Sequence, residues 1–375
     1  MRGQWVGAYS GTNSGIAIVD IDEVGNRFRG YTYLFDNNAA LPHTRADINV
    51  SKPTGNSLEA RLPLLPIDRN TVEVSSWLAI AQNYPGIQFP AYADVQMSWT
   101  PTQLMASWIT NINSSGSMTL PVTQAGAPSD YVPLPTVTNW AAFKNFAYGL
   151  DPDRYIFRGQ ETSSWRLRTS FHRTGRANLE RFLGEDIPRL HKHLSARTRH
   201  VFDMRKPEEH GAFVSLAQHH GYPTPLLDWT RSAFVGAYFA YRKLRNSDAM
   251  RALPDQKVRI YVFDREQWAG ELLQINRLAP ALPHLSLLDA LAIENARIIP
   301  QQALSTITNI DDVETYIRFV EHSRAKSYLQ VIDLPVQERP SVITELQQMG
   351  ITAGSMFPGL DGACEALKEQ YFPLA

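Results

Sequence analysis

A single arginine stands where a predicted strand meets a glycine. Residues 155–157 are apolar and predict a short strand, which we expect to end at the Arg-Gly-Gln of residues 158–160. A guanidinium is charged at every relevant pH and binds phosphate through a planar fork, and a neighbouring glycine lets a ligand approach the backbone. The stretch indicates an anion site with Arg158, Gly159 and Gln160 as contacts. The alternative, an arginine paired with a structural carboxylate, is the commoner arrangement.

Two adjacent histidines end a predicted helix over residues 211–221. Side chains one position apart on a helix point about 100° away from each other, so His219 and His220 are poorly placed to chelate an ion together. We therefore expect no metal site here. Imidazole does titrate near neutral pH, so either histidine is a candidate acid, base or ligand contact. A helix end with a satisfied core histidine is the alternative.

Further polar residues gather between this helix and the next. Thr224 lies between two prolines and must be extended, because residues before proline avoid the helical region. A short strand follows and ends near Asp228 and Thr230, and Thr230, Ser232 or Asp228 is a candidate cap of the next helix. Backbone N–H groups and the helix dipole favour anions at such a junction. We take Thr224, Asp228 and Thr230 as candidate site residues, with simple helix capping as the alternative.

A third polar pair precedes a predicted strand late in the chain. Gln301 and Gln302 follow the segment 297–300 and lead into a run with strand character. An amide can hold a hydroxyl group because it offers a donor and an acceptor together. Gln301 is therefore a candidate ligand contact, although two polar residues on an exposed strand are at least as common.

The bulk composition is that of an ordinary soluble protein. Of 375 residues, 43% are hydrophobic and 19% charged, and the net charge of -1 gives no reason to expect nucleic-acid or membrane binding. The one cysteine, Cys364, excludes an internal disulfide and a cysteine-based zinc site. The sequence has neither a signal-peptide core nor a run of about 18 apolar residues. We therefore expect a cytoplasmic protein.

The chain divides into two regions of different pattern. Residues 1–122 contain about eight short alternating segments separated by turn residues, which predicts an all-β antiparallel barrel or sandwich. Its opening Gly-x-Trp-x-Gly-x-Tyr resembles small up-and-down barrels of the avidin or lipocalin kind. Residues 123–137 hold three prolines and read as a linker. Residues 138–375 mix helices and strands, including a long predicted helix over 177–202, and indicate an α+β domain.

The polar stretches recur in an order that resembles the FRG-domain family, which is named for its Phe-Arg-Gly signature. The resemblance covers about residues 140–372 and rests on Phe157-Arg158-Gly159, on the run from Gln218 to Thr230, on Ala237, Phe239 and Ala240, and on the later segments RIIPQQ and GITAGSMFPGLDGACEAL. It implies a protein of bacteria or phages, where such domains often occur near toxin or anti-phage defence genes.

The motif order is also similar to that of ADP-ribosyltransferases. That similarity implies NAD as the substrate, with Arg158 contacting its phosphates or ribose, and with Asp228 and Thr230 as the middle motif. Gln301 would stand in place of the glutamate that polarises the ribose hydroxyl. The C-terminal domain would then have an ADP-ribosyltransferase-like fold.

Gln301 cannot supply the negative charge that stabilises a developing cation. Glu294 lies seven residues away, which is ~23 Å along a strand. Asp228 is the better substitute carboxylate if the fold brings it beside Arg158.

Three functions follow from these patterns. The first is an NAD- or nucleotide-utilising effector, an ADP-ribosyltransferase or NAD glycohydrolase, in which His219 or His220 orients the ribose or acts as acid or base. The second is a non-catalytic nucleotide sensor whose N-terminal β domain recognises a protein partner. The third is an interaction protein whose signature residues form a polar core network without chemistry.

Overall fold

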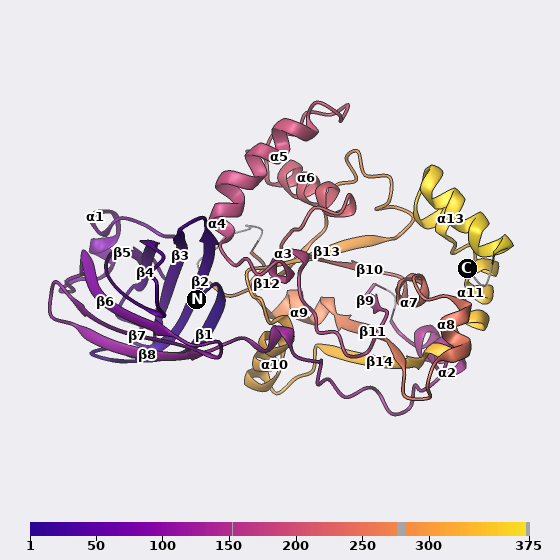
Figure 1. Ribbon diagram of the computed structural model, residues 1–375, viewed down its shortest axis with the longest axis horizontal. Helices are drawn as coiled ribbons and strands as arrows, with labels where there is room; N and C mark the ends of the chain where they lie inside the picture. Colours follow the sequence, from indigo (N-terminus) through magenta and orange to yellow (C-terminus); the bar gives the residue numbers. More distant parts are fainter. Residues whose placement is uncertain (152, 276–281, 373–375) are drawn as a thin grey trace.

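The computed structural model describes residues 1–151, 153–275 and 282–372. Figure 1 shows two β-rich units side by side, a barrel built from the start of the chain and a sheet with helices built from the rest. This is the predicted combination of an antiparallel β-barrel and an α+β domain.

The first unit is a closed barrel of eight antiparallel strands in chain order. The barrel closes where β1 pairs with β8 from Tyr9–Met118 to Gly11–Gly116. All eight predicted strands form, with these bounds: β1 (Gly3–Gly11), β2 (Gly15–Val24), β3 (Arg27–Asp36), β4 (His43–Ser51), β5 (Ser57–Ile67), β6 (Tyr92–Trp99), β7 (Gln103–Thr110) and β8 (Ser115–Pro121).

The barrel forms because its strands alternate between two environments. Inward-facing side chains such as Trp5, Val19 and Phe28 make one buried core, whereas their neighbours along the strands face outward. The long connection between β5 and β6 carries α1 (Trp77–Ile80) and the 3₁₀ turn η1 (Ala81–Asn83).

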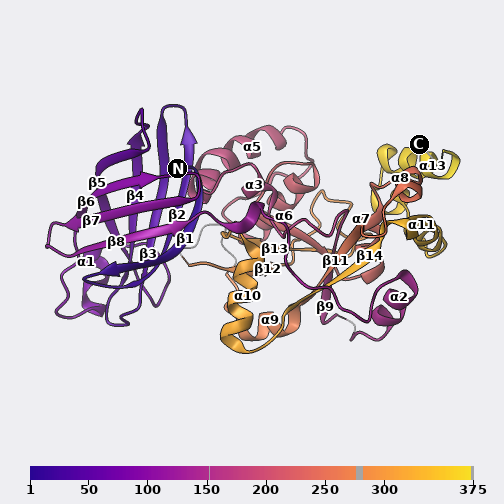
Figure 2. The ribbon, with the colours of Figure 1, turned by 60° about the horizontal axis from the view of Figure 1, so that its bottom comes forward.

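The second unit is built on a six-stranded antiparallel sheet with the order β12-β13-β10-β9-β11-β14. Figure 2 shows this sheet beside the barrel from a second direction. Its strands are β9 (Tyr155–Gln160), β10 (Leu226–Thr230), β11 (Lys257–Asp264), β12 (Leu285–Leu288), β13 (Ala303–Thr308) and β14 (Leu329–Pro335).

Helices cover both faces of this sheet. Alternate residues of β11 enter different cores: Ile260 packs on the side of α2, α7 and α11, and Phe263 on the side of α9 and α10. The helical elements are η2 (Gln124–Gly126), α2 (Trp140–Tyr148), α3 (Ser170–Arg173), α4 (Leu179–Arg181), the π-helical turn η3 (Phe182–Asp186), α5 (Ile187–Leu194), α6 (Pro207–His219), α7 (Ala233–Tyr241), α8 (Asn246–Arg251), α9 (Arg265–Glu271), α10 (Val313–Arg324), η4 (Val336–Glu338), α11 (Arg339–Gln348), α12 (Ala353–Met356) and α13 (Leu360–Tyr371).

The long helix predicted over 177–202 is wrong in its interior and at its end. The segment contains the short α4, the turn η3 and α5, and it leaves the helical conformation after Leu194. Pro188 explains the interruption, because proline has no N–H for the helical ladder and its ring crowds the preceding turn. A π-type turn before it accommodates the change.

The predicted strand end at residues 158–160 is also wrong. β9 continues through Gln160, because β11 pairs with it along all six residues, from Arg259–Gln160 to Asp264–Tyr155. Arg158 therefore lies within a strand.

The segment 123–137, read as a linker, packs against the second unit. The backbone N–H of Ser129 donates to the carbonyl of Ser164 at 2.8 Å, and that of Leu134 donates to Val331 at 2.9 Å. These bonds hold the connection along the edge of the sheet.

A buried carboxylate joins the two units. Asp22 of β2 accepts hydrogen bonds from the backbone N–H groups of Ala177 and Asn178, at 2.9 and 3.2 Å. It also accepts from Arg176 Nε at 3.0 Å and Arg181 Nη1 at 2.9 Å. Four donors on one carboxylate satisfy its buried charge, and they hold the barrel wall against the start of α4.

Asp20 lies near this junction and has a strongly perturbed acidity. Burial raises the pKa of Asp20 to about 8, and the negative charges of Asp22 and Asp311 raise it further. A hydrogen bond donated by Gln4 Nε2 at 2.9 Å opposes the shift. Asp20 is therefore protonated in the folded protein at neutral pH.

The raised pKa of Asp20 should make stability fall as pH rises. Between its unfolded value of 3.8 and its folded value of about 8, the unfolded chain loses the proton while the folded chain keeps it. We expect the melting temperature to decrease from about pH 5 to about pH 8, and Asp20→Asn to flatten that decrease. Thermal denaturation across this range checks the result, with the exposed Asp94→Asn as control. An unchanged slope in Asp20→Asn would contradict it.

Among the described residues, no helix has both the length and the apolar character needed to cross a membrane.

Candidate functional site

A cleft opens where two neighbouring strands separate. β10 pairs with β13 along its whole length, but it pairs with β9 only at Thr230–Phe157. Beyond this pair the strands diverge, and Arg158 and Gln160 on one side face Asp228 on the other across a cavity of about 1000 Å³. The separation thus brings together the two sequence-distant stretches that were predicted to share a site.

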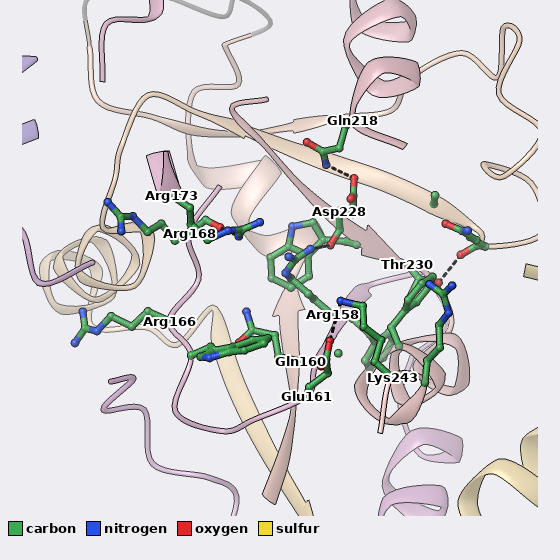
Figure 3. A pocket seen from close by; sticks show the side chains of 18 of the residues that line it. Arg158, Gln160, Glu161, Arg166, Arg168, Arg173, Gln218, Asp228, Thr230 and Lys243 are labelled. Carbon is green, nitrogen blue, oxygen red and sulfur yellow. Dashed lines mark hydrogen bonds and ion pairs between the residues drawn. The ribbon is translucent and has the colours of Figure 1, made fainter. Parts of the chain in front are cut away.

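Arg158 spans the gap between the strands. Its Nη1 donates to the backbone carbonyl of Asp228 at 2.6 Å, while its Nε is buried and has no hydrogen-bond partner among the described residues. Burial lowers the pKa of Arg158, and the nearby charge of Asp228 only partly offsets this. A partly buried guanidinium that bonds a neutral carbonyl is under-compensated, so an anion entering the cleft would be stabilised. Figure 3 shows Arg158 amid the lining side chains.

Gly159 lines the cleft, and its missing side chain also has a packing role that the sequence did not predict. A Cβ placed on it would come within 2.1 Å of the Gly236 carbonyl oxygen and 2.4 Å of the Ala240 nitrogen. The glycine therefore lets α7 pack directly on β9. Gly236 completes this close approach, because its own Cβ would lie 2.8 Å from that of Phe157.

Cations dominate the lining of the cleft. Two acidic side chains, Glu161 and Asp228, stand against seven basic ones: Arg158, Arg166, Arg168, Arg173, Arg242, Lys243 and Arg297. A single sign of charge in a concave, partly dehydrated site concentrates ligands of the opposite sign. The cleft therefore favours anions although the whole chain is nearly neutral.

Several of these cations are already paired with acids. Arg166 binds Asp130 and Asp312, Arg168 binds Asp311, Arg242 binds Glu365 and Lys243 binds Glu161. By contrast, Arg158, Arg173 and Arg297 form no ion pair among the described residues; each donates to a backbone carbonyl. These three carry the charge available to a ligand.

Arg158 and Arg173 repel one another across the cleft. Desolvation lowers the pKa of Arg173, and the charges of Arg158 and Arg168 lower it further. Figure 3 shows Arg168 and Arg173 together on one side of Arg158. An anion between Arg158 and Arg173 would relieve the repulsion, which is the arrangement expected of a phosphate site.

Gln160 adds a second unsatisfied group. Its side chain lines the cleft, and its Oε1 is buried with no hydrogen-bond partner in the described part of the chain. Buried polar atoms are nearly always paired in folded proteins. Two unpaired atoms in one cleft, Gln160 Oε1 and Arg158 Nε, therefore indicate a polar ligand.

Asp228 is held in place from the neighbouring helix. Gln218 Nε2 donates to Asp228 Oδ1, and the hydroxyl of Thr224 donates to Gln218 Oε1. Thr224 is fully buried and does not line the cleft, so the structure corrects its predicted role: it positions Gln218 and makes no ligand contact. Oδ2 of Asp228 has no partner among the described residues and remains open to a ligand.

The two histidines have different surroundings. His219 lines the cleft, and its Nδ1 bonds the side-chain amide of Asn295, which leaves Nε2 for a ligand. His220 is exposed beyond the end of α6 and does not line the cleft. Adjacent helical positions point in different directions, so the structure removes His220 from the predicted contacts.

Thr230 and Gln301 lie together at the far end of the cleft. The Thr230 hydroxyl donates to the backbone carbonyl of Gln301 at 2.7 Å, and Gln301 Nε2 donates to the carbonyl of Met356 at 2.8 Å. Both line the cleft but are mostly buried. The Thr230 hydroxyl hydrogen and one of the two Gln301 amide hydrogens are used by the protein, so Gln301 can still offer a ligand one donor and its acceptor oxygen.

Glu294 does not replace the missing glutamate. It lies outside the cleft lining, and its carboxylate accepts from the backbone N–H groups of Arg199 and His200 at 2.8 and 2.9 Å. The fold instead brings Asp228 beside Arg158, as the 2.6 Å hydrogen bond between the two residues shows. Asp228 is therefore the carboxylate that can act in place of the glutamate.

The predicted phosphate site at the N-terminus of α7 is wrong. Ser232 caps this helix, as expected, through a bond from the Val235 N–H at 3.3 Å. The cleft, however, contacts the other end of α7, where Phe239, Arg242 and Lys243 lie. Because Gly159 and Gly236 draw the helix along β9, its C-terminal end is the one beside the cleft.

Sequence reasoning missed several lining residues that come from separate elements. Arg173 ends α3, Arg297 precedes β13, and Phe357 follows α12 with Arg242 3.8 Å and Arg297 5.3 Å from its ring centroid. Residues 125–128 of the connection also line the cleft. Arg297 stood within a recognised motif; nothing in the sequence distinguished the others.

No group of three or more potential metal-ligating side chains occurs in residues 1–151, 153–275 and 282–372.

The family model of the FRG domain matches residues 153–249, a range that contains β9, β10 and α7 and ends before Gln301. No curated protein and no solved structure gives a significant match. Similarity to ADP-ribosyltransferases is not among these matches and stays a prediction.

Proposed function

Because the chain carries an FRG domain over residues 153–249, and because the signature residues of that domain line one cationic cleft, we propose that this cleft binds NAD or a related nucleotide and transfers its ADP-ribose unit. The proposal rests mainly on the position of Asp228 beside Arg158, which has no ion-pair partner among the described residues. The second cation, Arg173, lies close by.

The phosphates of the nucleotide occupy the space between Arg158 and Arg173. Neither guanidinium has a carboxylate partner among the described residues, so a pyrophosphate meets two charges that the fold leaves uncompensated. Arginine suits this role because its planar fork can bond two phosphate oxygens at once. The unpaired Gln160 Oε1 accepts a hydrogen bond from a hydroxyl group of the adjoining ribose.

Asp228 supplies the negative charge of the site. Its Oδ1 accepts a hydrogen bond from Gln218, and the open Oδ2 accepts one from a ribose hydroxyl group. In the transfer step, the bond between ribose C1′ and the nicotinamide nitrogen breaks, and the electron pair leaves with nicotinamide. A carboxylate near the resulting cationic sugar stabilises it most in the transition state.

The acceptor of the sugar is water or a hydroxyl- or nitrogen-bearing nucleophile. Its attacking atom forms the new bond to C1′ and releases a proton. His219 is the group placed to receive that proton, because Asn295 orients its ring through Nδ1 and leaves Nε2 toward the cleft. The products with water are ADP-ribose, nicotinamide and one proton.

The base of the nucleotide has an aromatic surface available. Trp165 lines the cleft with half of its surface exposed, which is unusual for a large indole. Stacking on an aromatic ring contributes about 1–3 kcal/mol per base in other nucleotide sites. We place the adenine or nicotinamide ring against Trp165.

A nucleotide sensor without turnover is the second candidate. Gln301 favours this candidate, because it stands where the resemblance calls for a glutamate. Its Nε2 also donates to the backbone carbonyl of Met356. In this case nucleotide binding would alter the cleft and the barrel would recognise a partner.

Incubation of the protein with labelled NAD separates the candidates. We expect release of nicotinamide, and we expect Asp228→Asn to reduce turnover about a hundredfold or more while binding stays within a few-fold. Asparagine keeps the acceptor for Gln218 but removes the charge. The matched control is Asp289→Asn, a change in an exposed aspartate outside the cleft. Saturable binding without turnover in the native chain would favour the sensor, and no binding of any nucleotide would refute both.

The resemblance further suggests a toxin or anti-phage effector, and a growth assay tests this. Expression in bacteria should slow growth, and Asp228→Asn should relieve the effect. Equal toxicity of both proteins would argue against an effector that acts through this cleft.

A further inference from the structure

The barrel holds a second cavity that the proposed function does not use. It has a volume of about 440 Å³ and lies inside the barrel at one end. Its walls are the inward-facing residues of the strands, such as Leu62, Val95 and Met118. Small barrels are commonly filled by side chains, whereas this one keeps a space within the range of small-molecule pockets.

Four loops surround the mouth of this cavity. Residues 12–13, 41–42, 86–90 and 112–115 come from the connections after β1, β3, β5 and β7. Arg69 ties two of these loops together, because its guanidinium donates to backbone carbonyls including that of Leu41 at 2.6 Å. Hydrogen bonds therefore hold the loops at the mouth together.

A buried hydroxyl in the wall has no partner. Thr32 of β3 is only 5% exposed and lines the cavity, and its Oγ1 bonds to nothing among the described residues. A buried hydroxyl without a hydrogen-bond partner destabilises the protein. A ligand that bonds Thr32 would remove this destabilisation.

The charge of the cavity is opposite to that of the cleft. Its lining contains one carboxylate, Asp36, and no lysine, arginine or histidine. The Tyr9 hydroxyl donates to Asp36 at 3.1 Å and the Asn38 N–H donates to it at 2.8 Å. A carboxylate at this place repels an anionic ligand and attracts an N–H or cationic group.

We propose that the barrel binds a small, largely apolar molecule that is neutral or cationic and carries an N–H group. The apolar walls bury its body, Thr32 satisfies a polar atom deep in the cavity, and Asp36 accepts a hydrogen bond near the mouth. The chain then has two ligand sites of opposite charge preference, one in each unit.

The neutral amine probe N-phenyl-1-naphthylamine tests this in the full-length protein. Titration should give saturable fluorescence enhancement that Ala46→Leu removes. The anionic analogue 1-anilinonaphthalene-8-sulfonate can also enter the cationic cleft, so only the part of its signal that Ala46→Leu removes is compared. That part should show at least about tenfold weaker binding, because the sulfonate meets Asp36. Arg158→Met is the control, since it changes the cleft only and should leave probe binding unchanged.

Two kinds of variant locate the probe. Ala46→Leu and Ala93→Leu fill the cavity from different strands and should each abolish binding, so either variant that folds suffices. Thr32→Val removes the hydroxyl at constant shape; it should raise the melting temperature of the empty protein and weaken the probe about fivefold. No saturable binding, equal binding of the anionic analogue, or undiminished binding in a folded cavity-filling variant would each overturn the proposal.

Discussion

Arg158→Met is expected to abolish nucleotide binding while leaving the protein folded. Methionine fills much of the space of the arginine stem but carries no charge, so the phosphates lose their main contact. Charge-assisted bonds to a partly buried anion contribute about 1.5–3 kcal/mol each, and loss of two such bonds weakens affinity at least about a hundredfold. Isothermal titration with NAD measures the effect.

Stability distinguishes this result from a structural role. Arg158 is partly buried against a neutral carbonyl and its Nε has no partner among the described residues, so its removal should change the melting temperature little or raise it. The matched control, Arg205→Met, removes a well-exposed arginine outside the cleft and should not affect binding. A large drop in melting temperature in Arg158→Met would mean that the guanidinium holds the sheet together and is not a ligand contact.

Gly159→Ala is expected to unfold or severely destabilise the second unit. The added methyl would lie 2.1 Å from a backbone oxygen of Gly236, and backbone cannot rotate away as a flexible side chain can. α7 must move off β9, which opens the core that contains Phe157 and Tyr238. Overpacking of this kind costs about 3 kcal/mol or more, and chemical denaturation with circular dichroism measures it.

A second glycine provides the comparison. Gly184→Ala adds the same methyl in η3, where no atom lies within 4 Å of the new Cβ, so it should be neutral or slightly stabilising. If Gly159→Ala unfolds at the same denaturant concentration as the native chain, the close packing of α7 on β9 is not required. Loss of nucleotide binding without loss of stability would instead restore the predicted role of Gly159 as a ligand contact.

The two proposals give the units different ligands. In these proposals the cleft takes an anion at Arg158 and Arg173, and the barrel takes a neutral or cationic molecule at Asp36 and Thr32. Asp22 fixes the barrel wall to the segment before α4. The separate variants Arg158→Met and Thr32→Val test each site alone.

Local pattern was sufficient to predict the barrel and most of its partner domain. Strict alternation between turn residues determined eight strands, because a strand with one buried face must place apolar residues at every second position. Ser232 was one of the candidate helix caps for a similarly local reason: its side chain bonds a backbone N–H three residues ahead.

Long-range packing decided the rest. The sequence alone marked Arg158, Asp228 and Gln301 as candidates, but the partial separation of β9 from β10 made them neighbours around a cleft. The role of Gly159 depends on backbone atoms of Gly236 and Ala240, far along the chain, and that of Thr224 on its buried hydrogen bond to Gln218. The charge of Arg173 matters because Arg158 lies near it. Residue type and spacing determine which groups are present; only the folded arrangement determines which of them remain without a partner and can bind a ligand.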